Sequence, residues 1–300
     1  GCFHSMWVLG SSLPPLLPTV FVVSVGISVK RLLDQKRIVC SNGTKQILIS
    51  AGKVKVVFFD KTGTLTKQGL DFVSSKSFGS YADDLHHAMM VCHTLTKSRS
   101  SGGSLVGNAV DKIMFQATEA VLLTHHERSS SSRRALSPRQ STVVRDPATD
   151  KEFTILKRFE FDHTTMTQSV LVRDESMEGI VSIFVKGSPE SIQAMATASS
   201  IPSEFDDIVR RSGRKGMYQI AMAKRLLPAD IADSWETMSR SDVERDVVFL
   251  GFVNFKNSLR EETPEVLAEL HRGDVRTIMV TGDSILTGIH MAYESGLVFE

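Results

Sequence analysis

The 300-residue sequence has few cysteines, few tryptophans and almost no net charge. Its three cysteines, Cys2, Cys40 and Cys92, are odd in number and scattered, which argues against a disulfide framework and fits a reducing cytosolic compartment. The 35 basic and 34 acidic side chains give a net charge of +1, so nothing indicates a nucleic-acid partner. The length allows two domains with real cores.

Charged residues are also absent from residues 1–29, and the stretch from Met6 onward is long enough to cross a bilayer. We do not expect a cleavable signal peptide, because no basic start precedes the stretch and prolines interrupt it. A buried helix of a soluble protein is the alternative. Four basic residues follow and predict a cytoplasmic end for a membrane-spanning helix: Lys30, Arg31, Lys36 and Arg37.

Three prolines lie within this uncharged stretch. They leave backbone carbonyls without helical donors, which a membrane tolerates where the backbone lines a polar cavity. Broken helices at mid-membrane are also where transporters bind substrate. We therefore expect a substrate pathway at Pro14, Pro15, Leu16, Leu17 and Pro18.

Residues 54–66, VKVVFFDKTGTLT, carry the strongest chemical pattern. The run 54–59 predicts a short buried strand with Asp60 at its carboxyl end. Lys61, Thr62, Gly63 and Thr64 then form a polar turn, where open α/β sheets bind ligands. An aspartate there can attack a phosphate, while turn amides, hydroxyls and a divalent metal neutralise charge.

Residues 247–300 predict strand and helix alternation, with strands at 247–255 and 276–280 around a helix at 259–272. The last strand ends in Thr281, Gly282 and Asp283. We expect the second half of a doubly wound sheet, in which the DKTGT and TGD turns meet at one phosphate.

The stretch 72–242 has a different character and predicts an inserted domain. A strand over 179–186 ends in KGSPE, where Ser188 can cap a following helix. Lys186 then lies beside free amides, a suitable place for a nucleotide phosphate. The Ser-rich stretches 97–104 and 127–145 predict mobile loops.

DKTGTLT resembles the phosphorylation signature of P-type ATPases, pumps of the haloacid dehalogenase superfamily. The resemblance implies that Asp60 becomes an aspartyl-phosphate and that Thr62 offers its carbonyl to Mg²⁺. It implies that Thr281 and Gly282 hold the phosphoryl group, with Asp283 completing the motif. The implied fold is α/β: a haloacid dehalogenase-like doubly wound parallel sheet, an inserted α+β nucleotide-binding domain and one N-terminal transmembrane helix.

KGSPE is similar to the KGAPE signature of the nucleotide domain in these pumps, which implies that Lys186 and Gly187 contact ATP. Phe161 matches the phenylalanine that stacks on adenine. Asp111 falls where the family has an acidic residue close to adenine, although a helix-surface aspartate is an equal alternative. Cations of the family are replaced here by Met166, Thr167 and Tyr218.

PPLLP resembles the fourth transmembrane helix of the fifth P-type class, and the neutral Leu16 favours its polyamine- and cation-transporting subgroup. The resemblance implies an integral protein of endosomal, lysosomal or vacuolar membranes with its soluble domains in the cytosol. It implies ATP and Mg²⁺ as cofactors and a cation or polyamine as cargo.

By this resemblance the chain divides into residues 1–37, a membrane helix, 38–71, a linker and the first part of the phosphorylation domain, 72–242, the nucleotide domain, and 243–300, the second part. The family's TGE and GDGxND motifs are not in the sequence. We therefore expect a fragment that works only with the missing parts of the same pump. Two alternatives stay open: a non-catalytic nucleotide-binding remnant and a membrane-tethered phosphatase. Thr62 disfavours the phosphatase, which usually has a second aspartate there.

Overall fold

The computed structural model describes residues 5–7, 17–40, 48, 50–98, 104–123, 142–176, 180–228 and 234–298. The chain divides into two compact units, each described by itself. The first unit comprises Gly1–Val57 and Leu270–Ile278, and the second comprises Phe58–Glu269 and Met279–Glu300. Both candidate site motifs, DKTGT and TGD, belong to the second unit.

The first unit contains the helix α2 (Leu17–Lys36). Pro14, Pro15 and Leu16 lie outside the described residues, and Leu17 and Pro18 begin α2. Among the helices that the structure describes, none combines the length and the apolar character that crossing a membrane requires. The predicted membrane-spanning helix is therefore not seen in this part of the chain.

The strand β1 (Val56–Asp60) pairs with β12 (Arg276–Val280). Asp60 is the last residue of β1, as predicted, but the strand is not buried: the side chain of Phe58 is 66% exposed. In the described residues β12 is the only strand beside β1, so its apolar side chains lack the cover of a larger sheet. The doubly wound parallel sheet is likewise not seen in these residues.

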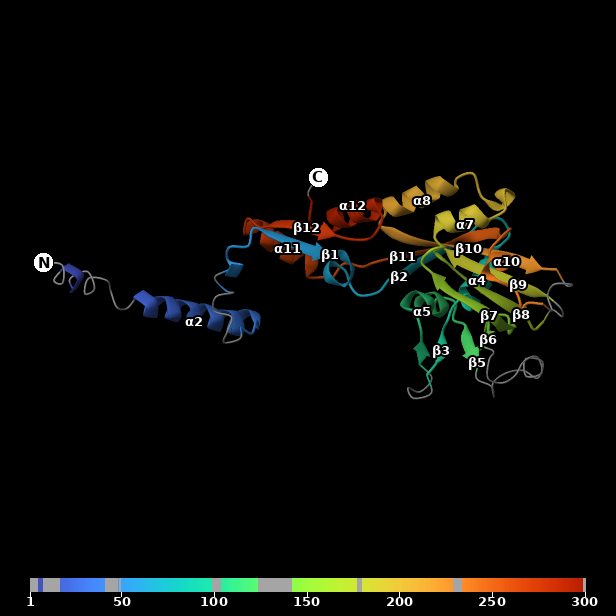
Figure 1. The fold of residues 1–300 in the computed structure, drawn as a ribbon, viewed down its shortest axis with the longest axis horizontal. Coiled ribbons are helices and arrows are strands. Elements are labelled where there is room, and N and C mark those ends of the chain that lie inside the picture. Colours follow the sequence, from blue (N-terminus) through green and yellow to red (C-terminus); the bar gives the residue numbers. More distant parts are fainter. Residues whose placement is uncertain are drawn as a thin grey trace. The chain divides into compact units, whose positions relative to one another are not determined.

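The second unit is built on an eight-stranded sheet in which every neighbouring pair is antiparallel (Figure 1). In spatial order its strands are β2 (Asp71–Ser77), β11 (Val248–Lys256), β10 (Met217–Leu227), β9 (Val181–Gly187), β8 (Thr167–Asp174), β7 (Glu152–Asp162), β6 (Thr142–Arg145) and β5 (Val121–Leu123). The edge strand β2 enters the sheet next to β11, which leaves it, and Asp71 lies opposite Lys256.

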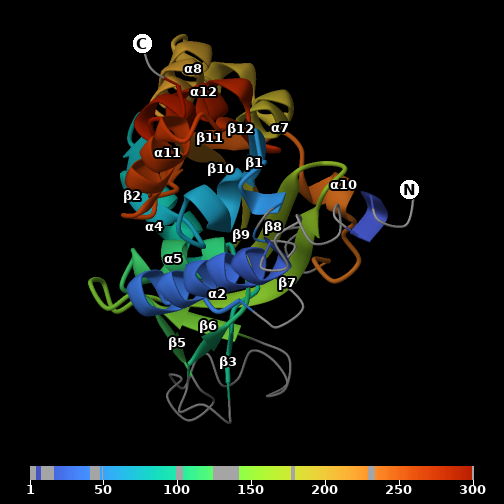
Figure 2. The same ribbon diagram turned by 90° about the vertical axis from the view of Figure 1, so that its left-hand side faces the viewer.

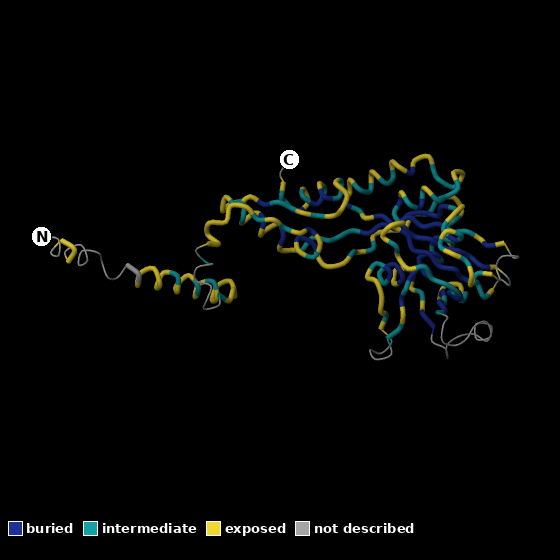
Figure 3. The backbone as a smooth tube through the Cα atoms, viewed as in Figure 1, coloured by how far each residue is buried: buried dark blue, intermediate teal, exposed yellow. Residues whose placement is uncertain are grey.

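Helices cover both faces of this sheet, and each face has its own apolar core (Figure 2). One core includes α4 (Ala82–Val91) and α5 (Ala109–Gln116). The other includes α7 (Pro189–Met195), α8 (Phe205–Arg214) and α10 (Arg240–Val243). The buried residues run along the central strands (Figure 3).

The remaining elements are the turn η1 (Lys61–Leu65), the hairpin β3 (Thr96–Lys97) and β4 (Leu105–Val106), the short helix η2 (Ala198–Ser200), and the helices α11 (Thr263–Arg272) and α12 (Ile285–Glu294). α12 packs against α8 in the second unit.

One prediction of local structure is wrong. The strand predicted at 247–255 forms as β11, but it joins the antiparallel sheet rather than a parallel one. A continuous apolar run only indicates burial on both faces, which either kind of sheet provides. The loops predicted at 97–104 and 127–145 fall mostly on residues that the structure does not describe. Their described ends include Lys97 of β3 and all of β6. Residues 99–103 and 124–141 lie outside the described part.

Candidate phosphoryl-transfer and nucleotide sites

The turn after β1 presents Asp60 to solvent. Gly63 has a φ of +80°, a conformation that glycine adopts without steric cost. Its amide donates to Thr66 Oγ1 over 3.2 Å, and the amide of Thr66 donates to the carbonyl of Lys61 over 3.1 Å. These bonds close the turn on itself, while the exposed Asp60, Thr62 and Thr64 stay accessible to a phosphate.

Lys61 connects the two predicted catalytic motifs. Its side chain is 2% exposed, and Nζ forms an ion pair with Asp283 and donates to Asn257 Oδ1 over 3.1 Å. Thr281 Oγ1 accepts a hydrogen bond from the amide of Asp283 over 3.1 Å. The structure therefore brings the DKTGT and TGD turns together, and the charge of Lys61 is occupied by this contact.

The stretch 257–263 holds the turn in place, a role that sequence reasoning missed. The guanidinium of Arg260 donates to the carbonyl of Gly63 over 2.9 Å and to that of Thr66 over 3.3 Å. Thr263 Oγ1 donates to the carbonyl of Leu65 over 2.8 Å. Asn257 Nδ2 donates to the carbonyl of Gly69 over 2.6 Å. The available signal was a run of polar residues directly after a buried strand.

A pocket of about 300 Å³ opens in the second unit, and it gathers all four residues predicted to contact a nucleotide. These come from three parts of the chain: Asp111 from α5, Phe161 from β7, and Lys186 and Gly187 from β9. The full lining is Asn108, Val110, Asp111, Phe161, His163, Met166, Gln168, Lys186, Gly187, Ser188, Tyr218 and Ile220. The volume and mixed lining are typical of a small-molecule site.

Asp111 and Lys186 form a buried ion pair at this pocket. The carboxylate also accepts a hydrogen bond from the amide of Thr94 over 3.1 Å. Asp111 is only 2% exposed, which rules out the helix-surface alternative. Asn108 caps α5 by accepting from the amide of Val110 over 2.8 Å, so the helix start that carries Asp111 is fixed.

Aromatic rings lie at the opening of the pocket. Phe161 is 44% exposed and contacts His163 edge to face, with ring centroids 5.0 Å apart. A partly exposed ring can stack on a nucleotide base. Gly187 is required by close packing, because a Cβ there would lie 2.6 Å from the carbonyl oxygen of Met166.

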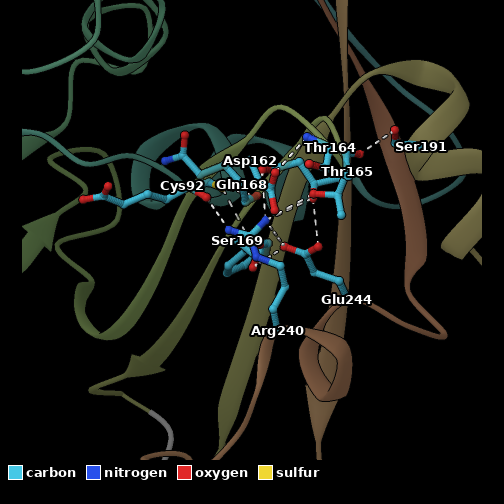
Figure 4. Close-up of polar contacts among 12 residues, drawn as sticks. Cys92, Asp162, Thr164, Thr165, Gln168, Ser169, Ser191, Arg240 and Glu244 are labelled. Atoms are coloured by element: carbon cyan, nitrogen blue, oxygen red, sulfur yellow. Dashed lines mark hydrogen bonds and ion pairs between the residues drawn. The ribbon is translucent and has the colours of Figure 1, made fainter.

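The three residues that replace cations of the family differ in what their side chains contact. Met166 and Tyr218 line the pocket, whereas Thr167 is buried and donates from Oγ1 to Glu244 over 2.8 Å. Arg240 reaches the same turn and donates to the carbonyl of Thr167 over 3.2 Å, but its charge is paired with Glu244 (Figure 4). Among the residues that the structure describes, the pocket lining therefore contains one lysine and no arginine.

The phenol of Tyr218, in the lining of the pocket, has a raised pKa. Burial raises the pKa of Tyr218, and the carboxylate of Asp283 raises it further because it disfavours the phenolate. Asp283 is also the partner of Lys61.

The residues predicted for Mg²⁺ are Asp60 and Thr62, through a carboxylate and a backbone carbonyl. Within the described ranges, no group of three or more His, Cys, Asp and Glu side chains is placed to hold a metal ion. Mg²⁺ is nevertheless commonly held by one or two protein carboxylates together with substrate phosphates and waters. The two oxygen donors at Asp60 and Thr62 fit that mode of binding. They do not fit a site in which the protein supplies all the ligands.

Residues 83–262 match the protein family described as P-type ATPase, cytoplasmic domain N. The chain is 29% identical, over an alignment 336 positions long, to the polyamine-transporting ATPase 13A3 of Homo sapiens, and the alignment covers 98% of the chain and 26% of that protein. It is 30% identical to the vacuolar cation-transporting ATPase YPK9 of Saccharomyces cerevisiae, with 95% and 23% covered. It is 31% identical to the probable cation-transporting ATPase 13A4 of Mus musculus, with 98% and 25% covered. The chain thus spans about a quarter of the length of these relatives.

Proposed function

Because the chain belongs to the P-type ATPase family, we propose that it binds ATP in the pocket of the second unit and accepts the γ-phosphoryl group on Asp60. The observation that carries this proposal is the gathering of Asp111, Phe161, Lys186 and Gly187 around one pocket. The ion pair between Lys61 and Asp283 supports the meeting of the DKTGT and TGD turns at one phosphoryl group.

The chain's own residues have separate roles in this proposal. Phe161 stacks on the base, and Lys186 contacts the nucleotide beside the amides at the start of α7. A carboxylate oxygen of Asp60 attacks the γ-phosphorus, and the bond to the bridging oxygen of ADP breaks.

The phosphoryl oxygens receive hydrogen bonds from the hydroxyls of Thr62, Thr64 and Thr281 and from the amide of Gly282. Asp60 and the carbonyl of Thr62 would hold Mg²⁺, which supplies charge neutralisation when bound.

The proposed cargo is a cation or a polyamine, moved by a pump of which this chain forms the central part. The support is the names of the relatives and the PPLLP stretch, in which Pro14, Pro15, Leu16, Leu17 and Pro18 are proposed as the substrate pathway. On this proposal the protein lies in an endosomal, lysosomal or vacuolar membrane, with the ATP and Asp60 sites in the cytosol.

Labelling by γ-labelled ATP tests the phosphoryl transfer. Membranes carrying the protein that contains this chain should acquire an acid-stable label in the presence of Mg²⁺, and Asp60→Asn should abolish it. Asp274→Asn is a suitable control, because the side chain of Asp274 is 95% exposed and Asp274 belongs to neither motif. Label that persists in the Asp60→Asn protein would contradict the proposal.

One observation favours a second candidate, a nucleotide-binding remnant without catalysis. Lys186 in the pocket lining is already paired with Asp111, and Met166 and Tyr218 occupy positions where the family has cations. Charge-assisted hydrogen bonds contribute about 1.5–3 kcal/mol each, so their absence weakens phosphate binding. In this case ATP binds weakly, and Asp60→Asn changes no activity.

A further inference from the structure

Phe161 lies on a bulge in the strand β7. Two residues of this strand, Glu160 and Phe161, stand opposite a single residue of β8. The ladder pairs on either side of them are Phe159 with Ser169 and Asp162 with Thr167. A bulge bends its strand and redirects a side chain, and Phe161 on this bulge lines the nucleotide pocket. The direction of the ring therefore depends on how the bulge is held.

A guanidinium from a distant part of the chain holds the backbone of this bulge. Arg240, the first residue of α10, donates from Nη2 to the carbonyl of Glu160, directly before Phe161. Its Nη1 donates to the carbonyl of Thr167 on the opposite strand over 3.2 Å. It also lies 3.4 Å from Thr165 Oγ1, in the turn that joins the two strands (Figure 4). One planar group thus connects both sides of the bulge.

Arg240 is itself fixed at both ends. At the backbone, α10 begins with a capping box, in which the amide of Ser239 donates to the carboxylate of Asp242 over 2.9 Å. At the guanidinium, Nη1 forms an ion pair with Glu244 over 3.3 Å, and the side chain of Glu244 is 5% exposed. The bulge is therefore tied to a side chain that has little freedom to move.

This contact is made from outside the nucleotide pocket. Arg240 is not among the described residues that line the pocket, whereas Phe161 is. The ring of Phe161 is 44% exposed, so packing around the ring does little to fix its direction. Its orientation is set mainly by its backbone, and Arg240 bonds to that backbone one residue away.

We propose that Arg240 is a positioning residue for nucleotide binding. It holds the bulge that presents Phe161 to the base, and it acts through that ring without touching the nucleotide. This inference rests on the proposed ATP site and adds a residue that prepares one wall of it. A contribution to folding alone is the competing explanation, because an arginine with several acceptors also stabilises the structure.

A double-mutant cycle with Phe161 distinguishes the two explanations. ATP binding is measured by calorimetry with the full 300-residue chain as wild type, Phe161→Ala, Arg240→Met and the double variant. Phe161→Ala should weaken binding roughly tenfold, and Arg240→Met should weaken it roughly threefold because the ring is less well oriented. The double variant should bind no more weakly than Phe161→Ala, since no ring is left to position.

Arg225→Met is the matched control. Arg225 on β10 donates from Nη1 to the carbonyls of Asp242 and Arg245, over 2.9 and 3.1 Å. It therefore makes the same kind of bond to the segment around α10, but among the described residues its guanidinium donates to neither strand of the bulge. This variant should keep the wild-type affinity for ATP. An equal loss in Arg225→Met would mean that loosening α10 is enough, and would contradict the inference.

Arg240→Lys guards against unfolding of Arg240→Met, in which Glu244 stays buried without its charged partner. Lysine keeps a positive charge beside Glu244, but its point charge cannot bond both sides of the bulge as a planar guanidinium does. It should unfold near the wild-type temperature and still bind ATP more weakly, except in the Phe161→Ala background.

Three results would overturn the inference alone: wild-type ATP affinity in a folded Arg240 variant, wild-type affinity in Phe161→Ala, and losses that multiply in the double variant. A wild-type chain that does not bind ATP would overturn the proposed ATP site and the inference with it.

Discussion

For the ion pair between Lys61 and Asp283, we predict that removing the charge of Asp283 costs more stability than removing that of Lys61. The side chain of Lys61 is 2% exposed and that of Asp283 is 31% exposed. Asp283→Asn leaves a buried ammonium group with only neutral partners such as Asn257, and removing one partner of a buried pair costs about 3–5 kcal/mol. Lys61→Met leaves a carboxylate that water can solvate, so we expect a cost of about 1 kcal/mol.

Urea unfolding at pH 7, followed by circular dichroism, measures both free energies. Lys256→Met is the control, because the Lys256–Glu294 pair has side chains 32% and 34% exposed and should contribute at most about 1 kcal/mol. We expect Asp283→Asn to lower the free energy of unfolding by about 2 kcal/mol more than Lys61→Met. Equal costs, or a larger cost for Lys61→Met, would refute the reasoning from burial.

Two further predictions concern buried groups of the same unit. Burial lowers the pKa of His93 to about 3. The folded chain keeps this imidazole neutral, so stability should fall as pH drops below about 6.5, by up to about 1.4 kcal/mol per pH unit. Urea unfolding at pH 7, 6 and 5 should show a weaker pH dependence in His93→Phe; an unchanged slope would refute the assignment. Burial also raises the pKa of the Cys92 thiol to about 12. A maleimide at pH 8 should therefore modify the part-exposed Cys40 and spare Cys92, as peptide mass spectrometry would show; equal labelling would contradict this.

Sequence patterns predicted the family, and they singled out four residues that the structure gathers around one pocket. The predicted P-type ATPase family is confirmed by the match over residues 83–262. The helix start at KGSPE could be predicted because it depends only on neighbouring residues. Ser188 caps α7 by accepting from the amide of Ser191 over 3.1 Å, and Pro189 occupies the first turn. Phe161 could be assigned to the pocket only through resemblance, since an apolar residue on a strand otherwise indicates core.

The contacts that sequence reasoning missed are made with the backbone. Arg260 and Asn257 donate to the carbonyls of Gly63 and Gly69, and a carbonyl gives no sign in the sequence of which side chain it accepts from. The sequence equally gives no sign of which group the side chain of Thr167 contacts. The sequence shows only that a cation is absent there, whereas its hydroxyl contacts Glu244 and not the pocket.

The pairing of β2 with β11 has a consequence for how the second unit can change. The chain enters the large sheet at Asp71 and leaves it at Lys256, residues that lie opposite each other on adjacent strands. Beside them, the amide of Lys67 donates to the carbonyl of Ser258 over 2.8 Å. Neighbouring strands are about 5 Å apart, so the segment between Asp71 and Lys256 begins and ends at nearly the same place. Insertions and deletions within this segment can therefore leave the spacing between the DKTGT and TGD turns unaltered. The segment can change in length or sequence while the two turns stay together.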